Sequence, residues 1–586
     1  MMLIKLNKKA LFIALMLCFT ASAYSVIEIL VTGEREDEVY DYYAASERAG
    51  PGIKTPADIL NSIPRLNITA KSFSAVQAHA SFGAGEFEHT AVLLDGIRIN
   101  DPQTGHYNFD IPITALEIGG IGVIKSGGAY YGLPGGIAGA INIERKKHAK
   151  DSVTLAGSYG SYSTYYSGLS IAKKSGEATA VISGEKSGSA GYHKETDFSK
   201  ETLYASFDYS GRYVLSAGFD EKNFGAFDFY TPGRGLPSRE HIITKRLDAS
   251  VEIMKGVKAA GHYRHHYDRF ILDNDNPSYF FNVHNNSVYG GGLSADFGKR
   301  EAAEIKAGYD FYREELQSLR LGNRYRNRHE VSVFAVTEAL KKTVVSAGLR
   351  VEKYEGKKEA AVMPAVGLEY YMTDNLTAEA SYAAAARHPN FTELYYTDPY
   401  NISNPGLGPE SSENYALGIK TGAEAYAAGI SGYFRRGYNL IEWGKTGVSD
   451  EKWMINNIGR TDTMGITVEA GIDTGIVLFK SFYEYSDSFR TREYISKYGL
   501  NYLKNRLNVS AEFEAVSIKI IAGYTHKNYS GRSGSLNDIS ASAVKRLNNG
   551  IDVYLKAENI LNDMFEETPG IPEMGRYLEA GIRAEI

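Results

Sequence analysis

The last nine residues of the chain alternate between apolar and polar side chains, and this pattern most constrains the fold. The apolar members are Leu578, Ala580, Ile582, Ala584 and Ile586, and between them lie Glu579, Gly581, Arg583 and Glu585. Successive side chains of a β-strand point to opposite faces, so a period of two predicts a strand with one apolar face and one polar face. The same period recurs at 516–525 and 551–558. We therefore predict a succession of β-strands from about residue 151 to the end.

Two all-β architectures fit this alternation. In a transmembrane β-barrel the apolar face meets lipid and the polar face meets the lumen, and aromatic residues form girdles at both lipid interfaces. The 43 Tyr and 25 Phe residues suit such girdles. A secreted soluble β-protein, such as a propeller, is the alternative. Composition alone leaves the two about level.

Residues 1–23 have the three parts of a secretory signal peptide. Lys5, Lys8 and Lys9 precede the apolar run 10–19, and the small residues of 21–23 form a cleavage site. The single cysteine lies in this leader, which excludes disulfides, thiolate metal sites and cysteine nucleophiles from the mature chain. The net charge of −6 becomes more negative once three lysines are removed, and this argues against nucleic-acid binding.

Three segments before residue 150 have readable local structure. Thr55, Pro56 and Asp58 form a helix start, with a hydroxyl cap, a proline in the first turn and an acidic residue behind it. Asp95-Gly96 lies between two apolar runs and predicts a tight β-hairpin. The hairpin leads into the polar loop 100–108, a loop type that points into solvent or at a ligand. The apolar hexamer 27–32 is either an ordinary first strand or a strand that adds to a partner's sheet edge.

Taken in order, these segments resemble TonB-dependent outer-membrane transporters. The resemblance is carried by PADILNSIPRLNI at 56–68, AVLLDGIRINDPQTGHYNFDIP at 91–112, AARHPNFTELYY at 385–396, NPGLGPESSENYALGIK at 404–420, YFRRGYNLIEW at 433–443 and AENILNDMFEETPGIPEMGRY at 557–577. It implies an all-β membrane protein, a transmembrane antiparallel β-barrel of 22 strands with a small α+β plug domain inside. The implied domains are a signal peptide at 1–23, a TonB box and linker at 24–50, the plug at 51–149 and the barrel at 150–586.

The chain departs from the family pattern at three places. Ala80-Ser81 replaces Arg-Gly, and residues 120–123 read Gly-Ile-Gly-Val where the family has Arg-Ile-Glu-Val. Because these are the places of pairing charges, we expect a simplified anchorage of the plug in the barrel. The chain also ends on Ile586 rather than Phe, so we expect weaker recognition by the barrel-assembly machinery.

The resemblance implies active transport of a scarce nutrient across the outer membrane of a Gram-negative-type bacterium, without enzymatic activity. We expect a monomer in outer-membrane lipid, energised by TonB and its inner-membrane complex. The expected TonB-binding residues are Ile27, Glu28, Ile29, Leu30, Val31 and Thr32. The compact length and the similarity at 404–443 and 557–586 favour a cobalamin-type nutrient or metal chelate. A ferric siderophore is the alternative, and haem is third. From other classes, a passive porin and an adhesin or phage-receptor barrel remain open.

Outward-pointing loops supply the candidate ligand contacts. From the plug loops and the segment 223–233 we predict Lys71, Phe73, Gln103, His106, Tyr107, Phe229 and Tyr230. Their alternative role is packing, or a place in an aromatic girdle.

The oxygen-rich segment 273–276 lies near a histidine cluster. Asp273 and Asp275 suit Ca²⁺ in an extracellular loop, although such residues also form ordinary turns. On a strand His262 and His266 share a face, whereas His265 takes the other. No cofactor is required, and no serine, zinc or cysteine catalytic motif has supporting context.

Overall fold

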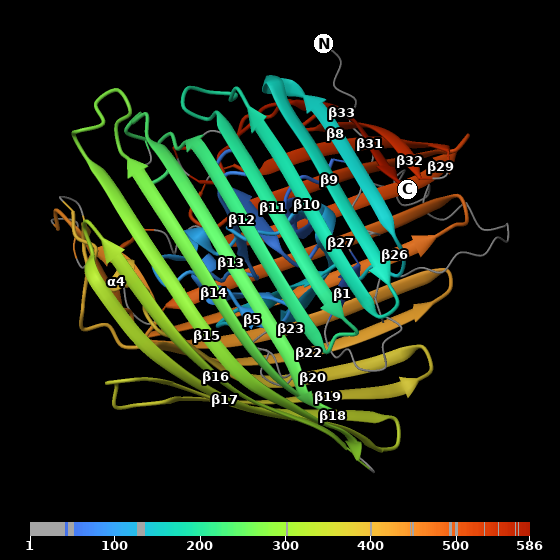
Figure 1. Cartoon of the computed structure of the whole chain (residues 1–586), viewed down its shortest axis with the longest axis horizontal. Helices are drawn as coiled ribbons and strands as arrows, with labels where there is room; N and C mark the ends of the chain where they lie inside the picture. Colours follow the sequence, from blue (N-terminus) through green and yellow to red (C-terminus); the bar gives the residue numbers. More distant parts are fainter. Residues whose placement is uncertain are drawn as a thin grey trace.

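In a computed structural model of the chain, the described residues are 41–44, 52–125 and 135–586, except 232, 301–302, 399–400, 446, 448–449, 491–494, 498–501, 533, 549, 569 and 572. The predicted TonB box, 27–32, lies outside them. The dominant element is a closed antiparallel barrel of 22 strands, which confirms the predicted architecture (Figure 1). Among the described residues, no helix has the length and apolar character needed to cross a membrane.

The barrel begins at β8 and closes where the last strand, β33, pairs with it. Its strands are β8 (Ser152–Gly160), β9 (Thr164–Ser175), β10 (Ala178–Ser189), β11 (Phe198–Tyr209), β12 (Tyr213–Gly225), β13 (Arg239–Met254), β14 (Val257–Ile271), β15 (Phe281–Arg300), β16 (Ala303–Ser318), β17 (Gly322–Leu340), β18 (Thr343–Tyr354), β19 (Ala361–Thr373), β20 (Leu376–Arg387), β22 (Glu410–Ala423), β23 (Tyr426–Tyr438), β26 (Arg460–Asp473), β27 (Val477–Arg490), β29 (Leu503–Ala515), β30 (Ile518–Tyr529), β31 (Leu536–Asn548), β32 (Ile551–Glu558) and β33 (Tyr577–Glu585).

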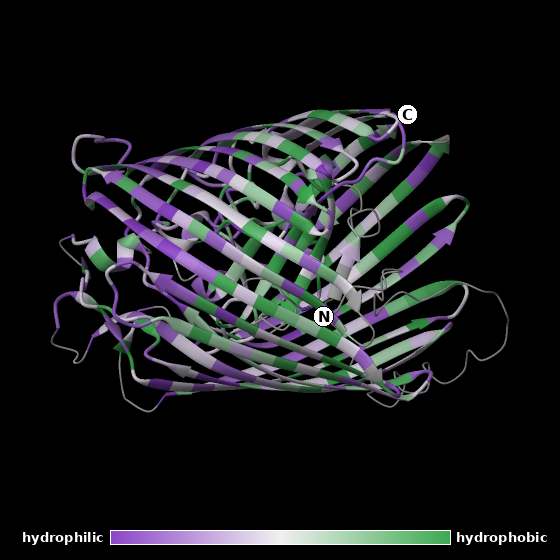
Figure 2. Ribbon diagram, turned by 60° about the horizontal axis from the view of Figure 1, so that its bottom comes forward, coloured by the Kyte–Doolittle hydropathy of each residue, from purple (hydrophilic) through white to green (hydrophobic). Residues whose placement is uncertain are grey.

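The predicted alternation of side chains distinguishes the outer face of the barrel strands from the face that lines the lumen. In β33, Leu578 and Ile582 are about half exposed, whereas Glu579 between them is 4% exposed and faces inward. Figure 2 shows the same alternation of hydrophobic and hydrophilic residues along neighbouring strands. Because a lipid-facing strand needs this pattern, the outer surface is suited to a membrane.

The connections differ at the two ends of the barrel. Short turns such as 210–212 and 255–256 join strands at one end, and longer loops join them at the other, which in outer-membrane barrels are the periplasmic and extracellular ends. The long loops carry helix α4 (Phe391–Tyr395) and a small sheet made of β21 (Asn401–Ile402), β24 (Ile441–Lys445), β25 (Trp453–Asn457) and β28 (Ile495–Ser496).

The plug is an α+β domain inside the barrel. Its sheet has the order β1-β6-β7-β4-β5, from β1 (Asp41–Ala44), β4 (Thr90–Leu94), β5 (Ile97–Arg98), β6 (Ile118–Lys125) and β7 (Gly139–Arg145). The other elements are α3 (Pro56–Asn61), β2 (Asn67–Ala70), β3 (Ala78–Ser81), η1 (Phe87–His89), η2 (Gly105–Tyr107) and η3 (Ala115–Glu117). Strand β1 lies in the predicted linker, so the plug sheet begins before the predicted boundary at residue 51.

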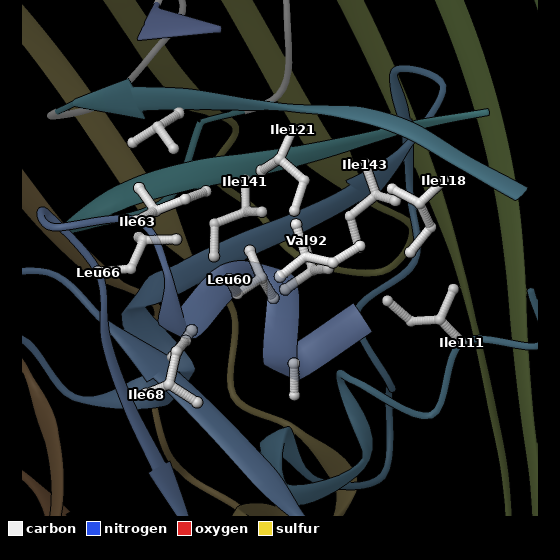
Figure 3. Close-up of a cluster of buried hydrophobic side chains, with 14 of the residues drawn as sticks. Leu60, Ile63, Leu66, Ile68, Val92, Ile111, Ile118, Ile121, Ile141 and Ile143 are labelled. Carbon is white, nitrogen blue, oxygen red and sulfur yellow. The ribbon is translucent and has the colours of Figure 1, made fainter. Parts of the chain in front are cut away.

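Local sequence explains two plug features, the start of helix α3 and the turn between strands β4 and β5. The Thr55 side chain accepts a hydrogen bond from the backbone N–H of Asp58, and the Asp58 carboxylate caps Thr55 in return, as predicted. Asp95 and Gly96 have φ values of 49° and 82°, the left-handed conformation that a two-residue hairpin turn requires. Helix α3 packs its apolar side, including Leu60, against the sheet, and the buried cluster of Figure 3 forms the plug core.

Candidate functional site

The predicted apical loop, 100–108, docks on the barrel wall instead of projecting into solvent. The buried Asp101 carboxylate accepts hydrogen bonds from Arg264 Nη1 at 2.5 Å and from Asn286 Nδ2 at 3.3 Å. It also accepts the backbone N–H of Gln103 at 2.8 Å. The loop carbonyl of Pro102 accepts the backbone N–H of Phe391, the first residue of α4. The loop is therefore held by both the wall and an extracellular helix.

The far end of the loop is also buried. Gln103 Nε2 donates to Asp268 at 3.3 Å, and the Tyr107 hydroxyl donates to Glu240 at 2.7 Å. Burial raises the pKa of Tyr107 well above its usual value, so this hydroxyl stays a proton donor. The Tyr107 ring also packs on His266, with ring centroids 4.5 Å apart.

The barrel loop 226–238 folds onto the plug next to this end. Lys71 Nζ donates to the Phe229 carbonyl at 2.9 Å and lies 4.8 Å from the centre of the Tyr230 ring. Desolvation lowers the pKa of Lys71 to about 8. His106 Nδ1 is 3.0 Å from Nε2 of His79, and burial lowers the pKa of both histidines. The two imidazoles are therefore neutral and share a hydrogen bond.

The structure thus brings most of the predicted ligand residues into one assembly, which also contains Phe73 in the same apolar cluster as Tyr107 and Phe229. They contact one another, and Lys71, Phe73, Gln103, Tyr107 and Phe229 are all buried. Their role as ligand contacts stays a prediction.

Beside the apical loop lies a cavity of about 70 Å³ that the sequence analysis missed. The plug supplies its floor, and strands β15 to β18, the end of β20 and the segment that follows β20 supply its walls. Its lining residues are Glu88, Arg98, Asn100, Asp101, Pro102, Gly105, Asn108, Val288, Tyr312, Glu314, Arg326, Arg328, Glu352, Tyr354, Arg387, His388 and Asn390. The one available clue was the spacing of charged residues at 326–330 and 350–352, which recur at every second position and therefore share one face of a strand.

The charges around this cavity are balanced. Arg328 Nη1 is 3.0 Å from Glu352 and Arg326 pairs with Glu314. Arg387 Nη2 is 2.9 Å from Glu393, and Arg98 Nη1 is 3.7 Å from Glu352. Every arginine of the lining therefore has a carboxylate within ion-pair distance.

His388 contributes to the lining a buried ring nitrogen, Nε2, that makes no hydrogen bond. Its side chain is 7% exposed. The nearest carboxylate oxygen, on Glu352, is 3.7 Å away, and the ring packs on Tyr354 with centroids 4.1 Å apart. Burial, aided by the charges of Arg326 and Arg328, lowers the pKa of His388 to about 3, so the imidazole is neutral.

The plug is anchored in the barrel by charges at positions other than 80–81 and 120–123, and the expected simplification of its anchorage stays a prediction. The plug lacks charges at 80–81 and 120–123 but makes ion pairs to the barrel from other positions, because buried charges need partners wherever they occur. These pairs are Lys54–Glu579, Arg65–Glu469, Arg98–Glu352, Asp101–Arg264, Asp110–Lys222 and Lys146–Glu585. His89 Nε2 also lies 3.5 Å from a carboxylate oxygen of Glu410.

The predicted calcium residues lie in an exposed turn. Asp273 accepts the backbone N–H of Asp275 at 3.0 Å, and Asp275 accepts a hydrogen bond from Lys194 Nζ at 3.1 Å. Within the described ranges, three His, Cys, Asp or Glu side chains nowhere gather to hold a metal ion. Calcium at this turn stays a prediction. In β14, His266 is completely buried.

Comparison with known proteins decides the family. Residues 127–559 match the family model described as TonB dependent receptor-like, beta-barrel. This chain belongs to the TonB-dependent receptor family. It is thus an outer-membrane β-barrel receptor that functions in active nutrient uptake, in a family of transporters rather than enzymes.

Two sequence relatives bear the name "Vitamin B12 transporter BtuB". The protein from Vibrio vulnificus is 22% identical over 78% of both chains. The protein from Photobacterium profundum is 27% identical over 25% of this chain, and this match spans only 26% of that relative's length.

Solved structures share the fold. The ferric enterobactin receptor PfeA from Pseudomonas aeruginosa, in a mutant form, has a TM-score of 0.74 at 13% identity and covers 94% of this chain and 98% of its own. The FrpB iron transporter from Neisseria meningitidis has a TM-score of 0.75 at 14% identity and covers 93% and 99%. The copper transporter OprC has a TM-score of 0.76 at 14% identity and covers 93% and 98%.

Proposed function

We propose that this receptor takes up an uncharged, amide-bearing metal complex of the cobalamin (vitamin B12) type. The ligand would bind at the extracellular end of the plug, over the cavity beside the apical loop. The observation that carries the proposal is the charge balance of that cavity. The printed names of the sequence relatives point to the same ligand class.

The paired charges of the cavity favour a neutral ligand over an anionic one. A multiply anionic ferric chelate needs cations without partners, but the carboxylates of Glu314, Glu352, Glu393 and Glu410 already neutralise the four arginines of the lining. Adding a net charge to a low-dielectric site without a counter-charge is costly. A neutral ligand that offers hydrogen-bond donors and acceptors avoids this cost. Cobalamin is such a ligand, because primary carboxamide arms surround its corrin ring.

Transport requires the plug to move. The plug sheet is enclosed by the barrel, and ion pairs such as Arg65–Glu469 and Asp110–Lys222 join the plug to the barrel wall. We propose that TonB pairs with residues 27–32 and that its pull on this segment breaks some of these contacts. A passive porin would need neither a plug nor a pulling partner. The proposed receptor works as a monomer in outer-membrane lipid. Calcium bound at the 273–276 turn is not required for the proposed transport.

Ligand titration of the purified, detergent-solubilised receptor tests the proposal. Cyanocobalamin, a ferric tris-catecholate, a ferric hydroxamate and haemin are offered separately, with calcium and with a chelator, and bound ligand is read from its absorbance after gel filtration. We expect cyanocobalamin to co-elute with the receptor and to protect it from heat. Retention of a ferric chelate or haemin without cobalamin would overturn the substrate assignment, and retention of none would favour an adhesin or phage-receptor barrel.

A further inference from the structure

The cavity beside the apical loop is far too small for a whole corrin ring. A water molecule needs about 10–15 Å³ of cavity volume. A cavity of about 70 Å³ therefore has room for about five water-sized groups. A propionamide arm has a similar number of non-hydrogen atoms. The size therefore suits one side arm of a larger ligand, with the rest of the ligand outside the cavity.

Two polar atoms around the cavity lack partners. His388 Nε2 and Arg328 Nε are both buried and make no hydrogen bond. Leaving a buried polar group unpaired is costly, so a group that pairs with these atoms gains affinity. Glu352 also offers a hydrogen-bond acceptor to a ligand in the cavity, because its carboxylate lies 3.7 Å from His388 Nε2.

From this arrangement we infer that the cavity is a subsite for a primary carboxamide arm of the nutrient, with His388 as its specificity-determining residue. The inference rests on the proposed function and names the part of the ligand that enters this site. Arg328 Nε–H faces the amide oxygen, and Glu352 accepts from the amide N–H. The neutral His388 ring supplies the remaining contact.

The chemistry of neutral imidazole explains why an amide fits better than an acid. A neutral histidine presents Nε2 either as a donor or as an acceptor, depending on its tautomer. A carboxamide offers both a donor and an acceptor and satisfies either form. A carboxylate offers acceptors only and would also lie close to Glu352. A site built to bond an N–H rejects a ligand that lacks it, because its own polar groups are left unpaired.

The test compares cyanocobalamin with its monocarboxylic acids, in each of which one amide arm is hydrolysed. Affinities for the full-length receptor in detergent are measured by equilibrium dialysis at neutral pH. We expect one of these acids to bind about tenfold more weakly than cyanocobalamin and the others to bind about equally, because about 1.4 kcal/mol corresponds to a factor of ten.

His388→Leu should weaken cyanocobalamin binding about tenfold and remove the discrimination against that acid. His388→Gln, which keeps a donor and an acceptor, should retain most of both. His241→Leu is the matched control, since His241 lies on β13 outside the cavity lining and pairs with Glu221 at 2.8 Å. It should bind like the wild type.

The possible failures are distinguishable. If wild type binds cyanocobalamin but treats all the acids alike, or if His388→Leu keeps the discrimination, the subsite is wrong and the proposed function stands. If neither wild type nor His241→Leu binds cyanocobalamin, the proposed function and the subsite both fall. Loss of binding in His388→Gln equal to that in His388→Leu would assign His388 a purely structural role and overturn the inference.

Discussion

Asp101→Asn should release the apical loop from the barrel wall without unfolding the barrel. In the wild type, the Asp101 and Arg264 side chains are almost completely buried, and their charged atoms are 2.5 Å apart. Asparagine preserves the size and keeps an oxygen for the backbone N–H of Gln103. It removes the negative charge, however, and leaves Arg264 as a buried cation without its counter-charge.

The expected magnitude follows from that loss. Breaking a buried ion pair by removing one partner costs about 3–5 kcal/mol. If only the lower value acts on loop docking, the undocked population rises about 100-fold. Hydrogen exchange of the peptide 100–108 measures this population, because the docked loop protects amides such as Gln103 N–H and releases them on local opening. Exchange in strands β13 and β14 should remain slow.

A double-mutant cycle gives the control. Arg264→Met should release the loop less, because it leaves a buried carboxylate that still accepts from Asn286 and from the backbone. Asp101→Asn with Arg264→Met should recover part of the protection, because no unpaired charge remains. Exchange at 100–108 that changes less than about threefold in Asp101→Asn, with the barrel intact, would contradict a docked loop held by this ion pair.

Three further outcomes are expected. Leu30→Pro should abolish energised uptake but leave ligand affinity unchanged, because proline removes the backbone donor that strand pairing with TonB needs; wild-type uptake in this variant would exclude 27–32 as the TonB box. Deletion of 24–149 should convert the receptor into a leaky pore in planar bilayers, whereas a porin's conductance would not change. The Lys71 pKa is about 8 in the folded plug, below its ordinary value of 10.5, so the unfolded state binds more protons between these values and stability should rise as the pH increases from 8 to 10.5. The protection of amides 69–77 from hydrogen exchange, relative to their intrinsic base-catalysed rates, should increase over this window in wild type and show no such trend in Lys71→Met.

Much of the fold was predictable because it rests on short-range rules. The period of two in segments such as 578–586 follows directly from a wall with lipid on one side and a polar lumen on the other. The cap at Thr55 and the turn at Asp95-Gly96 are decided by neighbouring residues. The start of the plug sheet was not predictable, since Tyr43 joins the plug core through pairing of β1 with β6, far along the chain.

The site was harder because its contacts join distant parts of the chain. Lys71 bonds the carbonyl of Phe229, 158 residues away, and no local pattern announces that loop 226–238 folds onto the plug. Loop position alone identified residues that do gather there, but it indicated exposure where the structure shows burial. The cavity was missed for the opposite reason: inward arginines and glutamates on strands look like an ordinary polar lumen until their register brings them together.

Glu352 connects the cavity with the plug. Its Oε2 lies 3.7 Å from Arg98 of the plug and 3.0 Å from Arg328 of the wall, while its Oε1 faces His388. One carboxylate therefore serves the ligand cavity and one of the plug's anchoring ion pairs. A ligand group that donates a hydrogen bond to Glu352 competes with Arg98 for the same negative charge. Such competition is reciprocal by thermodynamic linkage: whatever weakens the hold on Arg98 when the cavity fills must also weaken ligand binding when the plug is held in place.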